Sequence, residues 1–409
     1  MELDYKKLGL FALIIGAAII FALLIYFFFF RQFYGPSPVI TSGLTTSTAT
    51  STLPAAGQAT TGTGNNNGSG QFPINSNTSA DNNATAGQQS QQNTISALTT
   101  STAYFAAPDG DNNLVYYNAK DGKFYKVTSD GKITEYSDKI FHNVQNVVWS
   151  NSKQKAILQY PDGTNIIYDF SQNKQINLQK HWSDFTFSPN DQQIAFKSMA
   201  LDPENRYLAI GDSSGSNLKI IESIGGSENK FQVNWSPNNA MIAQFVDGKG
   251  LNRSEIYFVG LNNENFKSMV VEGRGFEGLW TPDGNAMVYS VYSTDDYKPT
   301  LWISGASPDN VGSGRNVLGL DTWASKCSFG NPTTLYCAVP KKMPYGAGIE
   351  PELLRGTADD IYQIDMQTGA KKLIAQQGSH EISKIYPLSN SKYILFTDAV
   401  DGKIYRIEL

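Results

Sequence analysis

The stretch Trp235-Ser236-Pro237-Asn238-Asn239-Ala240-Met241-Ile242-Ala243 decides the fold of this chain. An aromatic residue ends one apolar run, a Ser-Pro-Asn turn follows, and a second apolar run begins. The same pattern recurs around Phe187, around Trp280 and, without the proline, around Trp149. Successive anchors lie about 38, 48 and 45 residues apart, and periods of roughly 40 to 50 residues are typical of propellers, solenoids and arrays.

The content of each period distinguishes these architectures. Apolar runs of about five to seven residues, with alternating and β-branched content, are separated by Asp-Gly and Ser-Gly turns, which indicates strands. No repeat contains ten or more residues at helical spacing, which disfavours helical repeats. Four strands per period form one propeller blade. The sequence therefore predicts an all-β fold, a β-propeller of seven four-stranded blades over residues 102–409, with six or eight blades as alternatives.

The repeated motif resembles that of the TolB-type, WD-repeat-like propeller family, whose signature is Trp-Ser-Pro-Asp-Gly followed by a short apolar strand. The resemblance covers about residues 103–409. It departs from the family in its degenerate copies at both ends and in the apparent absence of the α/β domain that precedes the propeller in TolB. The resemblance implies a protein-binding module and no particular chemistry.

An apolar segment, residues 8–30, precedes the repeats. About 23 residues of helix span about 34 Å, which is enough to cross the hydrocarbon core of a bilayer. A cleavable signal peptide would have a shorter apolar core and a small-residue cleavage site. We therefore expect a single-pass transmembrane signal-anchor helix. Two lysines, Lys6 and Lys7, precede the apolar segment, and one arginine, Arg31, follows it. This difference in positive charge favours a short cytoplasmic N-terminus, residues 1–7, and an extracytoplasmic propeller.

Residues 31–101 are rich in Ser, Thr, Asn and Gly, and between about 35 and 100 the only charged residue is Asp81 and the only aromatic residue is Phe72. Such a segment buries too little apolar surface to offset the entropy of ordering. We expect a flexible linker with a root-mean-square span of roughly 45 Å.

The last predicted blade lacks a strand, because the chain ends after apolar runs near 391–397 and 403–408. Propellers commonly close their ring with a strand from the other terminus, and residues 93–99 are the available candidate. Cys327 and Cys337 bracket one predicted hairpin, so they either form a disulfide between adjacent strands or remain two buried thiols. Outside the cytoplasm a disulfide would persist.

A candidate binding face follows from the expected topology. The loop that enters the first strand of each blade and the loop between the second and third strands lie at the same end of the ring. Insertions are predicted there at 199–205, 247–253, 293–298 and 340–357. Lengthened loops on a rigid scaffold usually carry binding, although neutral surface insertions are the alternative. The residues assigned to this face are His142, Trp182, Arg253, Arg274, Asp295, Asp296, Trp323, Tyr345, Arg355 and His380.

No catalytic, cofactor-binding or metal-binding residue is assigned. His142, His181 and His380 occupy the same place in the repeat, and three histidines can bind zinc, but neighbouring blades supply only two of them. The match to G-x-S-x-G at 211–215 joins two predicted strands instead of forming the strand-to-helix turn that a serine nucleophile requires. A net charge of −5 does not predict a nucleic-acid partner.

The sequence thus predicts a membrane-anchored, extracytoplasmic propeller that binds a protein or a cell-envelope polymer without catalysis. One alternative is an envelope enzyme that acts on a glycan or peptide at the loop-rich face. Another is a structural spacer. An enzyme would show a deep polar pocket with perturbed carboxylates or histidines, whereas a binding module would show a broad surface.

Overall fold

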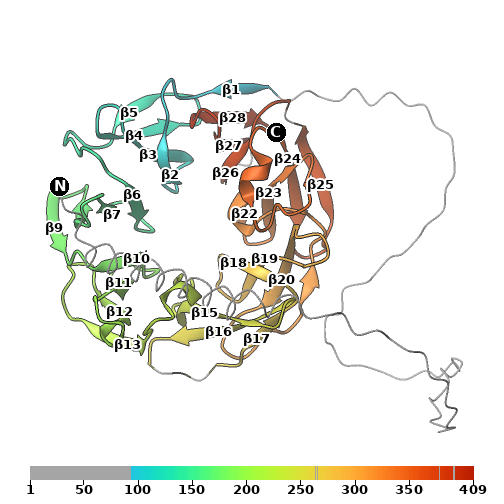
Figure 1. Cartoon of the computed structure of the whole chain (residues 1–409). Coiled ribbons are helices and arrows are strands. Elements are labelled where there is room, and N and C mark those ends of the chain that lie inside the picture. Colours follow the sequence, from blue (N-terminus) through green and yellow to red (C-terminus); the bar gives the residue numbers. More distant parts are fainter. Residues whose placement is uncertain (1–93, 263, 265, 377, 390–391) are drawn as a thin grey trace, which may run out of the picture. The chain divides into compact units, whose positions relative to one another are not determined.

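A computed structural model describes residues 94–262, 264, 266–376, 378–389 and 392–409 of the protein. In this part the chain forms seven four-stranded antiparallel sheets, which Figure 1 shows arranged as the blades of a ring. The predicted all-β, seven-bladed propeller is therefore confirmed. The predicted transmembrane helix, residues 8–30, and nearly all of the predicted linker lie outside the described residues. Within the described ones, no helix has both the length and the apolar character needed to span a membrane.

In blades one to six the strands follow one another in chain order from the centre of the ring outward, and in blade seven β1 lies outside β28 (Figure 1). Blade one consists of β2 (Tyr104–Pro108), β3 (Asn113–Asn118), β4 (Lys123–Thr128) and β5 (Ile133–Glu135). Blade two consists of β6 (Asn146–Trp149), β7 (Lys155–Gln159), β8 (Asn165–Asp169) and β9 (Lys174–Leu178). Blade three consists of β10 (Trp182–Phe187), β11 (Gln193–Ser198), β12 (Tyr207–Asp212) and β13 (Lys219–Ser223). Blades four and five are β14 (Phe231–Val233), β15 (Met241–Lys249), β16 (Arg253–Gly260) and β17 (Met269–Val271); and β18 (Arg274–Trp280), β19 (Ala286–Tyr292), β20 (Pro299–Gly305) and β21 (Asn316–Val317).

Blade six is β22 (Cys327–Asn331), β23 (Thr334–Pro340), β24 (Asp359–Asp365) and β25 (Lys371–Gln376), and blade seven is β26 (Ile382–Pro387), β27 (Tyr393–Asp398), β28 (Ile404–Glu408) and β1 (Ile95–Ala97). Short 3-10 turns interrupt the connections at η2 (Pro203–Asn205), η3 (Glu228–Lys230), η4 (Ala324–Lys326) and η5 (Pro351–Leu354). The buried apolar side chains form clusters within and between neighbouring blades, so the core follows the ring.

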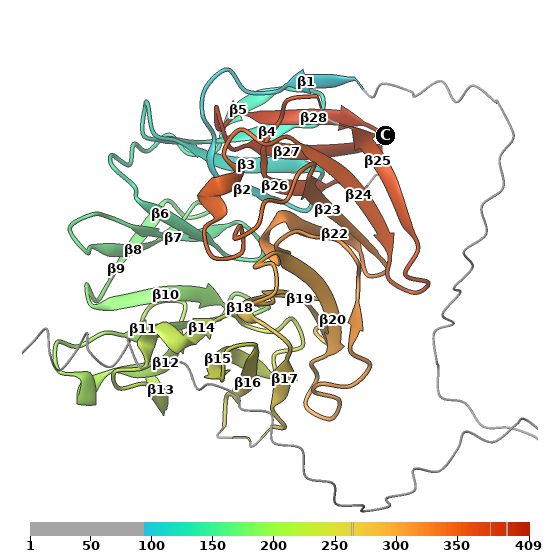
Figure 2. The ribbon, with the colours of Figure 1, turned by 45° about the vertical axis from the view of Figure 1, so that its right-hand side comes forward.

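Blade seven is completed by a strand from the opposite end of the described chain. β1 lies beside β28 (Figure 2), with Ile95 opposite Ile407. The pairing continues beyond the strand, because the hydroxyl oxygen of Thr99 accepts a hydrogen bond from the N–H of Ile404 at 3.0 Å. The predicted closure of the ring by residues 93–99 is confirmed.

The serine or threonine of the repeated motif organises the turn that gives the motif its regular form. The hydroxyl of Ser236 accepts the N–H of Met241 at 2.9 Å and donates to the side-chain oxygen of Asn238 at 2.7 Å. Ser236 is fully buried although residues 237–239 of the turn are exposed, so its hydroxyl satisfies the N–H of the buried Met241, which water cannot reach. In the other copies, too, the serine or threonine hydroxyl accepts the backbone N–H of the residue five positions later. The pairs are Ser188 with Gln193, Thr281 with Ala286, and Ser150 with Lys155.

The aromatic residue of the motif joins one blade to the next. The indole N–H of Trp149 donates to the carbonyl of Phe105 at 2.7 Å, and that of Trp280 donates to the carbonyl of Asn234 at 3.2 Å. Both acceptors lie on or beside the innermost strand of the preceding blade. Trp235 differs, because its indole N–H donates to Asn239 within its own turn. In two copies of the motif, the aromatic residue therefore links neighbouring blades by a hydrogen bond.

A carboxylate clamps the corresponding turns of blades two and three. Asp191 accepts the N–H of Asn151 at 2.6 Å and the N–H of Ser152 at 2.9 Å. Burial alone would raise the pKa of Asp191, but the hydrogen bonds from Ser152 and Asn151 outweigh it and hold the pKa below its usual value. The carboxylate is therefore ionised at neutral pH and keeps the two blades together at this end of the ring.

The two cysteines form a disulfide within blade six. Cys327 in β22 lies directly opposite Cys337 in β23, and their Cα atoms are 4.1 Å apart. Both side chains are fully buried. The first of the two alternatives left open by the sequence is confirmed.

Candidate functional site

One end of the ring, here called the loop face, carries the connections between blades and the loop between the second and third strands of each blade. Because antiparallel strands alternate in direction, the described chain enters the propeller at the opposite end. Ile95, the first residue of β1, pairs with Ile407 near the end of β28, which is the third strand of its blade. The chain therefore reaches β1 from the end opposite the loop face.

The four most exposed large apolar side chains in the described part of the chain all lie on loops of this face. Leu201 is 100% exposed, Leu251 81%, Val400 71% and Tyr345 66%. They belong to the loops between the second and third strands of blades three, four, seven and six. Isolated exposed apolar residues are common, but here the four most exposed ones lie at the same end of the ring.

The blade-three loop holds Leu201 in an ordered backbone. The guanidinium of Arg206 donates to the carbonyl of Ala200 at 2.9 Å and pairs with Glu228 at 3.0 Å. Asp202 caps η2 by accepting a backbone N–H from within the same loop. The loop thus presents an apolar side chain to solvent while its own backbone is hydrogen-bonded, which reduces the entropy lost when a partner covers it.

Blade four projects a long hairpin instead of the loop predicted at 247–253. β15 and β16 pair as far as Lys249 and Arg253, so only 250–252 form the turn that carries Leu251. The guanidinium of Arg274 lies against Gly248, where an added Cβ would be 1.5 Å from one of its nitrogens. The hairpin is joined to blade five, because the hydroxyl of Thr294 donates to the side-chain oxygen of Asn252.

The loops of blades five and six are bonded to each other. The N–H of Gly346 donates to the carbonyl of Asp296 at 3.1 Å, and the N–H of Gly348 donates to the carbonyl of Tyr297 at 2.6 Å. A Cβ at Gly348 would lie 2.6 Å from the Cβ of Tyr292, so only glycine permits this approach. The loops of blades four, five and six therefore form one continuous, hydrogen-bonded ridge.

A small core supports the blade-six loop from below. Trp323 is 8% exposed and packs with Ala347 and Leu354 from the loop, with Met343 partly buried against them. Tyr345, on the outer side of the same loop, meets the ring of Tyr297 edge-on at 5.6 Å between centroids. The indole of Trp323 is thus a support for the ridge and is not itself available to a partner.

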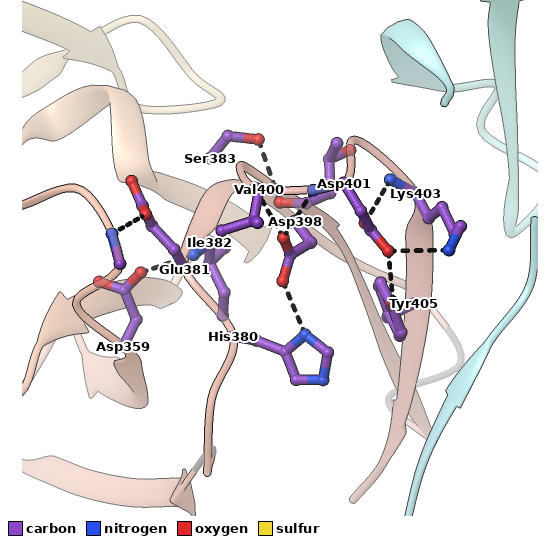
Figure 3. Close-up of polar contacts among 12 residues, drawn as sticks. Asp359, His380, Glu381, Ile382, Ser383, Asp398, Val400, Asp401, Lys403 and Tyr405 are labelled. Atoms are coloured by element: carbon purple, nitrogen blue, oxygen red, sulfur yellow. Dashed lines mark hydrogen bonds and ion pairs between the residues drawn. The ribbon is translucent and has the colours of Figure 1, made fainter. Parts of the chain in front are cut away.

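Buried charge joins blade six to blade seven, as Figure 3 shows in part. Asp359 is completely buried, pairs with the ammonium group of Lys326 at 2.7 Å and accepts the N–H of Ile382 at 2.6 Å. Burial raises the pKa of Asp359, and the positive charge of Lys326 acts in the opposite direction. Beside this pair, the carboxylate of Glu381 accepts the N–H of Gly356 at 2.7 Å.

His380 positions the exposed tip of blade seven. Its Nδ1 lies 2.7 Å from a carboxylate oxygen of Asp398 (Figure 3), and its ring packs against Phe396 and Tyr405. The other oxygen of Asp398 accepts the N–H of Val400 at 2.7 Å. The histidine is therefore tied to the turn that presents Val400.

The remaining residues predicted for this face occupy different environments. Trp182 is 5% exposed and stacks on Phe196 at 4.0 Å between centroids, so its indole belongs to the core of blade three, which corrects its assignment to the binding face. Arg253 pairs with Glu272 and Arg355 with Glu352, each at 2.9 Å, and His142 and Asp295 are exposed. The sequence prediction included Tyr345 but missed Leu201, Leu251 and Val400, each of which stands in a short turn rich in polar or small residues.

No cluster of possible metal ligands lies on this face among the residues that the structure describes. Among residues 94–409, apart from the few positions left undescribed, no three His, Cys, Asp or Glu side chains lie together as a possible metal site. Of the three histidines, His380 is held by Asp398 while His142 and His181 are exposed on separate inter-blade connections.

No protein-family model and no curated protein matches this sequence. The structure is similar to the Swd1 (Cps50) β-propeller domain of Myceliophteria thermophila, with a TM-score of 0.51, 10% identity, and 77% of this chain and 100% of that chain covered. It is also similar to the tricorn protease, with a TM-score of 0.50, 12% identity, and 79% of this chain but 34% of that chain covered. Likeness at these identities shows the fold alone, and the protein is a β-propeller.

Proposed function

We propose that this protein is a non-catalytic binding module of the TolB type that holds a protein partner on its loop face. The observation that carries the proposal is the gathering of its four most exposed large apolar side chains on that face. When a partner covers them, the removal of apolar surface from water stabilises the complex by roughly 25 cal/mol for each Å² buried. The loops that present them are already hydrogen-bonded, so little ordering is required when a partner binds.

The charges of the loop face favour a protein over an extended anionic polymer. Arg206, Arg253 and Arg355 each pair with a glutamate, and Lys298 lies 3.8 Å from Asp296. Interspersed, paired charges around apolar tips resemble the polar rim and apolar centre of protein interfaces. A nucleic-acid or anionic-lipid surface would instead require an excess of unpaired basic residues.

Photo-crosslinking tests this face directly. We expect the photoreactive residue p-benzoylphenylalanine, placed at Leu201, Leu251 or Tyr345 of the full chain in its native cells, to give discrete protein adducts. The matched controls are Ile133 and Leu373, which are exposed apolar residues on the outermost strands of blades one and six. Once the crosslinked protein is identified, Leu251→Ser is expected to weaken its binding by roughly tenfold or more, as at interface anchors. Equal adducts at tips and controls, or adducts with lipid alone, would refute the assignment.

We propose in addition that residues 8–30 anchor the module to a membrane, with the propeller outside the cytoplasm. The apolar length and the flanking lysines of the sequence support this arrangement. The described chain enters β1 at the end opposite the loop face, so a tether attached there leaves the loop face accessible to a partner.

Protease added to intact cells is expected to cut within residues 31–93 and to release a domain of about 300 residues, because this segment is rich in small, polar residues of the kind that proteases reach. The released domain is identified by mass spectrometry of the culture supernatant. A cytoplasmic protein of the same cells serves as the control for lysis. A propeller that is protected until the membrane is breached would reverse the proposed orientation.

A further inference from the structure

A polar pocket lies on the loop face between blades two and three, and none of its lining residues belongs to the loops that carry the exposed apolar tips. Its volume is about 490 Å³, within the usual range of sites for small ligands. The loop between the second and third strands of blade two borders it with Tyr160 and Pro161, and the connection to blade three borders it with Lys180. Neutral polar side chains line much of the rest: Gln145, Asn146, Gln159, Asn165 and Ser183.

Three amide side chains form a hydrogen-bonded row along one side of this pocket. Asn146 in β6 is directly opposite Gln159 in β7, and Gln159 is directly opposite Asn165 in β8. Side chains in directly opposed positions of antiparallel strands share one face of the sheet. The Nδ2 of Asn146 donates to the Oε1 of Gln159 at 2.8 Å, and the Nε2 of Gln159 donates to the Oδ1 of Asn165 at 3.2 Å.

The buried end of the row fixes the orientation of all three amides. Asn165 is 2% exposed, and its Nδ2 donates to the carbonyls of Gln179 at 3.1 Å and Trp182 at 2.9 Å. Because a carbonyl only accepts, the nitrogen of Asn165 must face these groups, and each following amide is oriented by the one before it. The exposed end of the row is therefore the Oδ1 of Asn146, an acceptor held in a fixed direction at the pocket.

Hydrogen-bond donors surround this acceptor. Asn146 and Gln159 each have a second amide N–H that the bonds of the row do not use. The hydroxyl of Ser183 and the side-chain amide of Gln145 line the pocket and make no hydrogen bond to any residue that the structure describes. The pocket thus combines oriented acceptors and donors, and little ordering is needed when a ligand binds to them.

The lining offers no free charge to a ligand. Lys180 pairs with Asp162 at 3.0 Å. Burial raises the pKa of the Tyr160 phenol, so this side chain is uncharged at neutral pH. No aspartate, glutamate, histidine or cysteine occurs among the described residues that line the pocket, so these residues supply no acid, base or nucleophile of those types.

We propose that this pocket binds a neutral saccharide, either a free sugar or one residue of a glycan. Each sugar hydroxyl both donates and accepts, so neighbouring hydroxyls match the Oδ1 of Asn146 and the N–H groups beside it. The half-buried ring of Tyr160 supplies apolar surface for the C–H groups of a sugar ring. An anionic ligand would instead meet the outward oxygen of Asn146. The site goes beyond the proposed protein partner and uses none of the apolar tips, so either proposal can fail without the other.

The test uses the full chain in a detergent without a sugar headgroup and isothermal titration with the methyl glycosides of glucose, galactose, mannose and N-acetylglucosamine. We expect saturable binding of at least one of them with a Kd on the order of 1–10 mM, as for a ligand of roughly a dozen non-hydrogen atoms. The fully O-methylated form of that sugar, which lacks hydroxyl donors, and the corresponding uronate are expected to bind at least about tenfold more weakly. A trisaccharide of equal affinity would indicate a free sugar as the ligand, and one that binds about tenfold more tightly would indicate a glycan chain.

Two amide truncations locate the site. Asn146→Ala is expected to weaken binding of the sugar about tenfold or more, because it removes the outward acceptor and its neighbouring donor. Gln154→Ala, which removes an exposed amide at the opposite end of blade two, is expected to leave the affinity unchanged within about twofold. Circular dichroism confirms that both variants fold, and Gln145→Ala replaces Asn146→Ala if the latter does not. Absence of saturation by all four sugars below about 50 mM, equal affinity for the sugar and its O-methylated form, or equal affinity of the pocket variant and Gln154→Ala would overturn the proposal.

Discussion

A chain that begins at residue 101 is expected to melt roughly 5–10 °C below one that begins at residue 91, because only the longer chain contains the strand that closes the ring. The two chains differ by residues 91–100, which include β1 (Ile95–Ala97). Melting is followed by circular dichroism of both purified domains under the same conditions.

The physical reason is the loss of packing and pairing at one edge. Ile95 packs against the core between blades six and seven, and Leu98 packs against the core between blades seven and one. Deleting them exposes apolar surface of β28 and leaves that strand with an unpaired edge. A loss of about 3 kcal/mol at roughly 2–3 °C per kcal/mol, the lower part of the range for domains of about 150–250 residues, gives a shift within these limits.

The rest of the linker is not expected to contribute to the stability of the propeller. An internal deletion of 35–90 in the full chain is expected to leave the melting temperature of the propeller unchanged, since the closing strand remains. If the chains beginning at 91 and 101 melt together, β1 does not close the ring in solution.

Asp359→Ala is expected to cost about 3–5 kcal/mol of unfolding free energy, the usual effect of removing one member of a buried ion pair. Asp359 is completely buried, and the side chain of Lys326 is 14% exposed. Without the carboxylate, the ammonium group of Lys326 remains in a poorly hydrated position, and the N–H of Ile382 loses its acceptor. Urea denaturation at neutral pH measures the change.

Asp360→Ala is the matched control, because it removes the neighbouring carboxylate, which lies 3.5 Å from the ammonium group of the more exposed Lys341. We expect it to cost about 1 kcal/mol or less, as for other partly exposed pairs. Equal losses from Asp359→Ala and Asp360→Ala would show that the Lys326 pair has no special role in joining blades six and seven.

The sequence predicted the number of blades and the closure of the ring because these depend on local chemistry repeated along the chain. The motif around Ser236 combines a turn, a buried hydroxyl and an aromatic residue within a few positions, so each copy marks the start of a hairpin. The ten-residue spacing of Cys327 and Cys337 allowed a disulfide across one hairpin, and the register of β22 and β23 decided for it.

Which side chains the loop face presents could not be predicted in this way. The sequence assigned Trp182 and Trp323 to this face, and large aromatic residues there are common interface anchors. The structure buries both indoles, one on Phe196 and the other beneath the blade-six loop, and exposes Leu201 and Val400 instead. The side chains of a short turn are exposed to solvent unless a neighbouring blade covers them. No local sequence pattern predicts whether a neighbouring blade does so.

The sequence by itself determined the strand content, the blade repeat and the strand that closes the ring, because backbone turns and alternating apolar residues act over a few positions. Only the tertiary structure decided which side chains the loop face presents and how its loops are joined. The carbonyl of Asp296 accepts the N–H of Gly346, 50 residues further along the chain. Such contacts depend on where neighbouring blades are placed by the closed ring, and that placement belongs to no single segment.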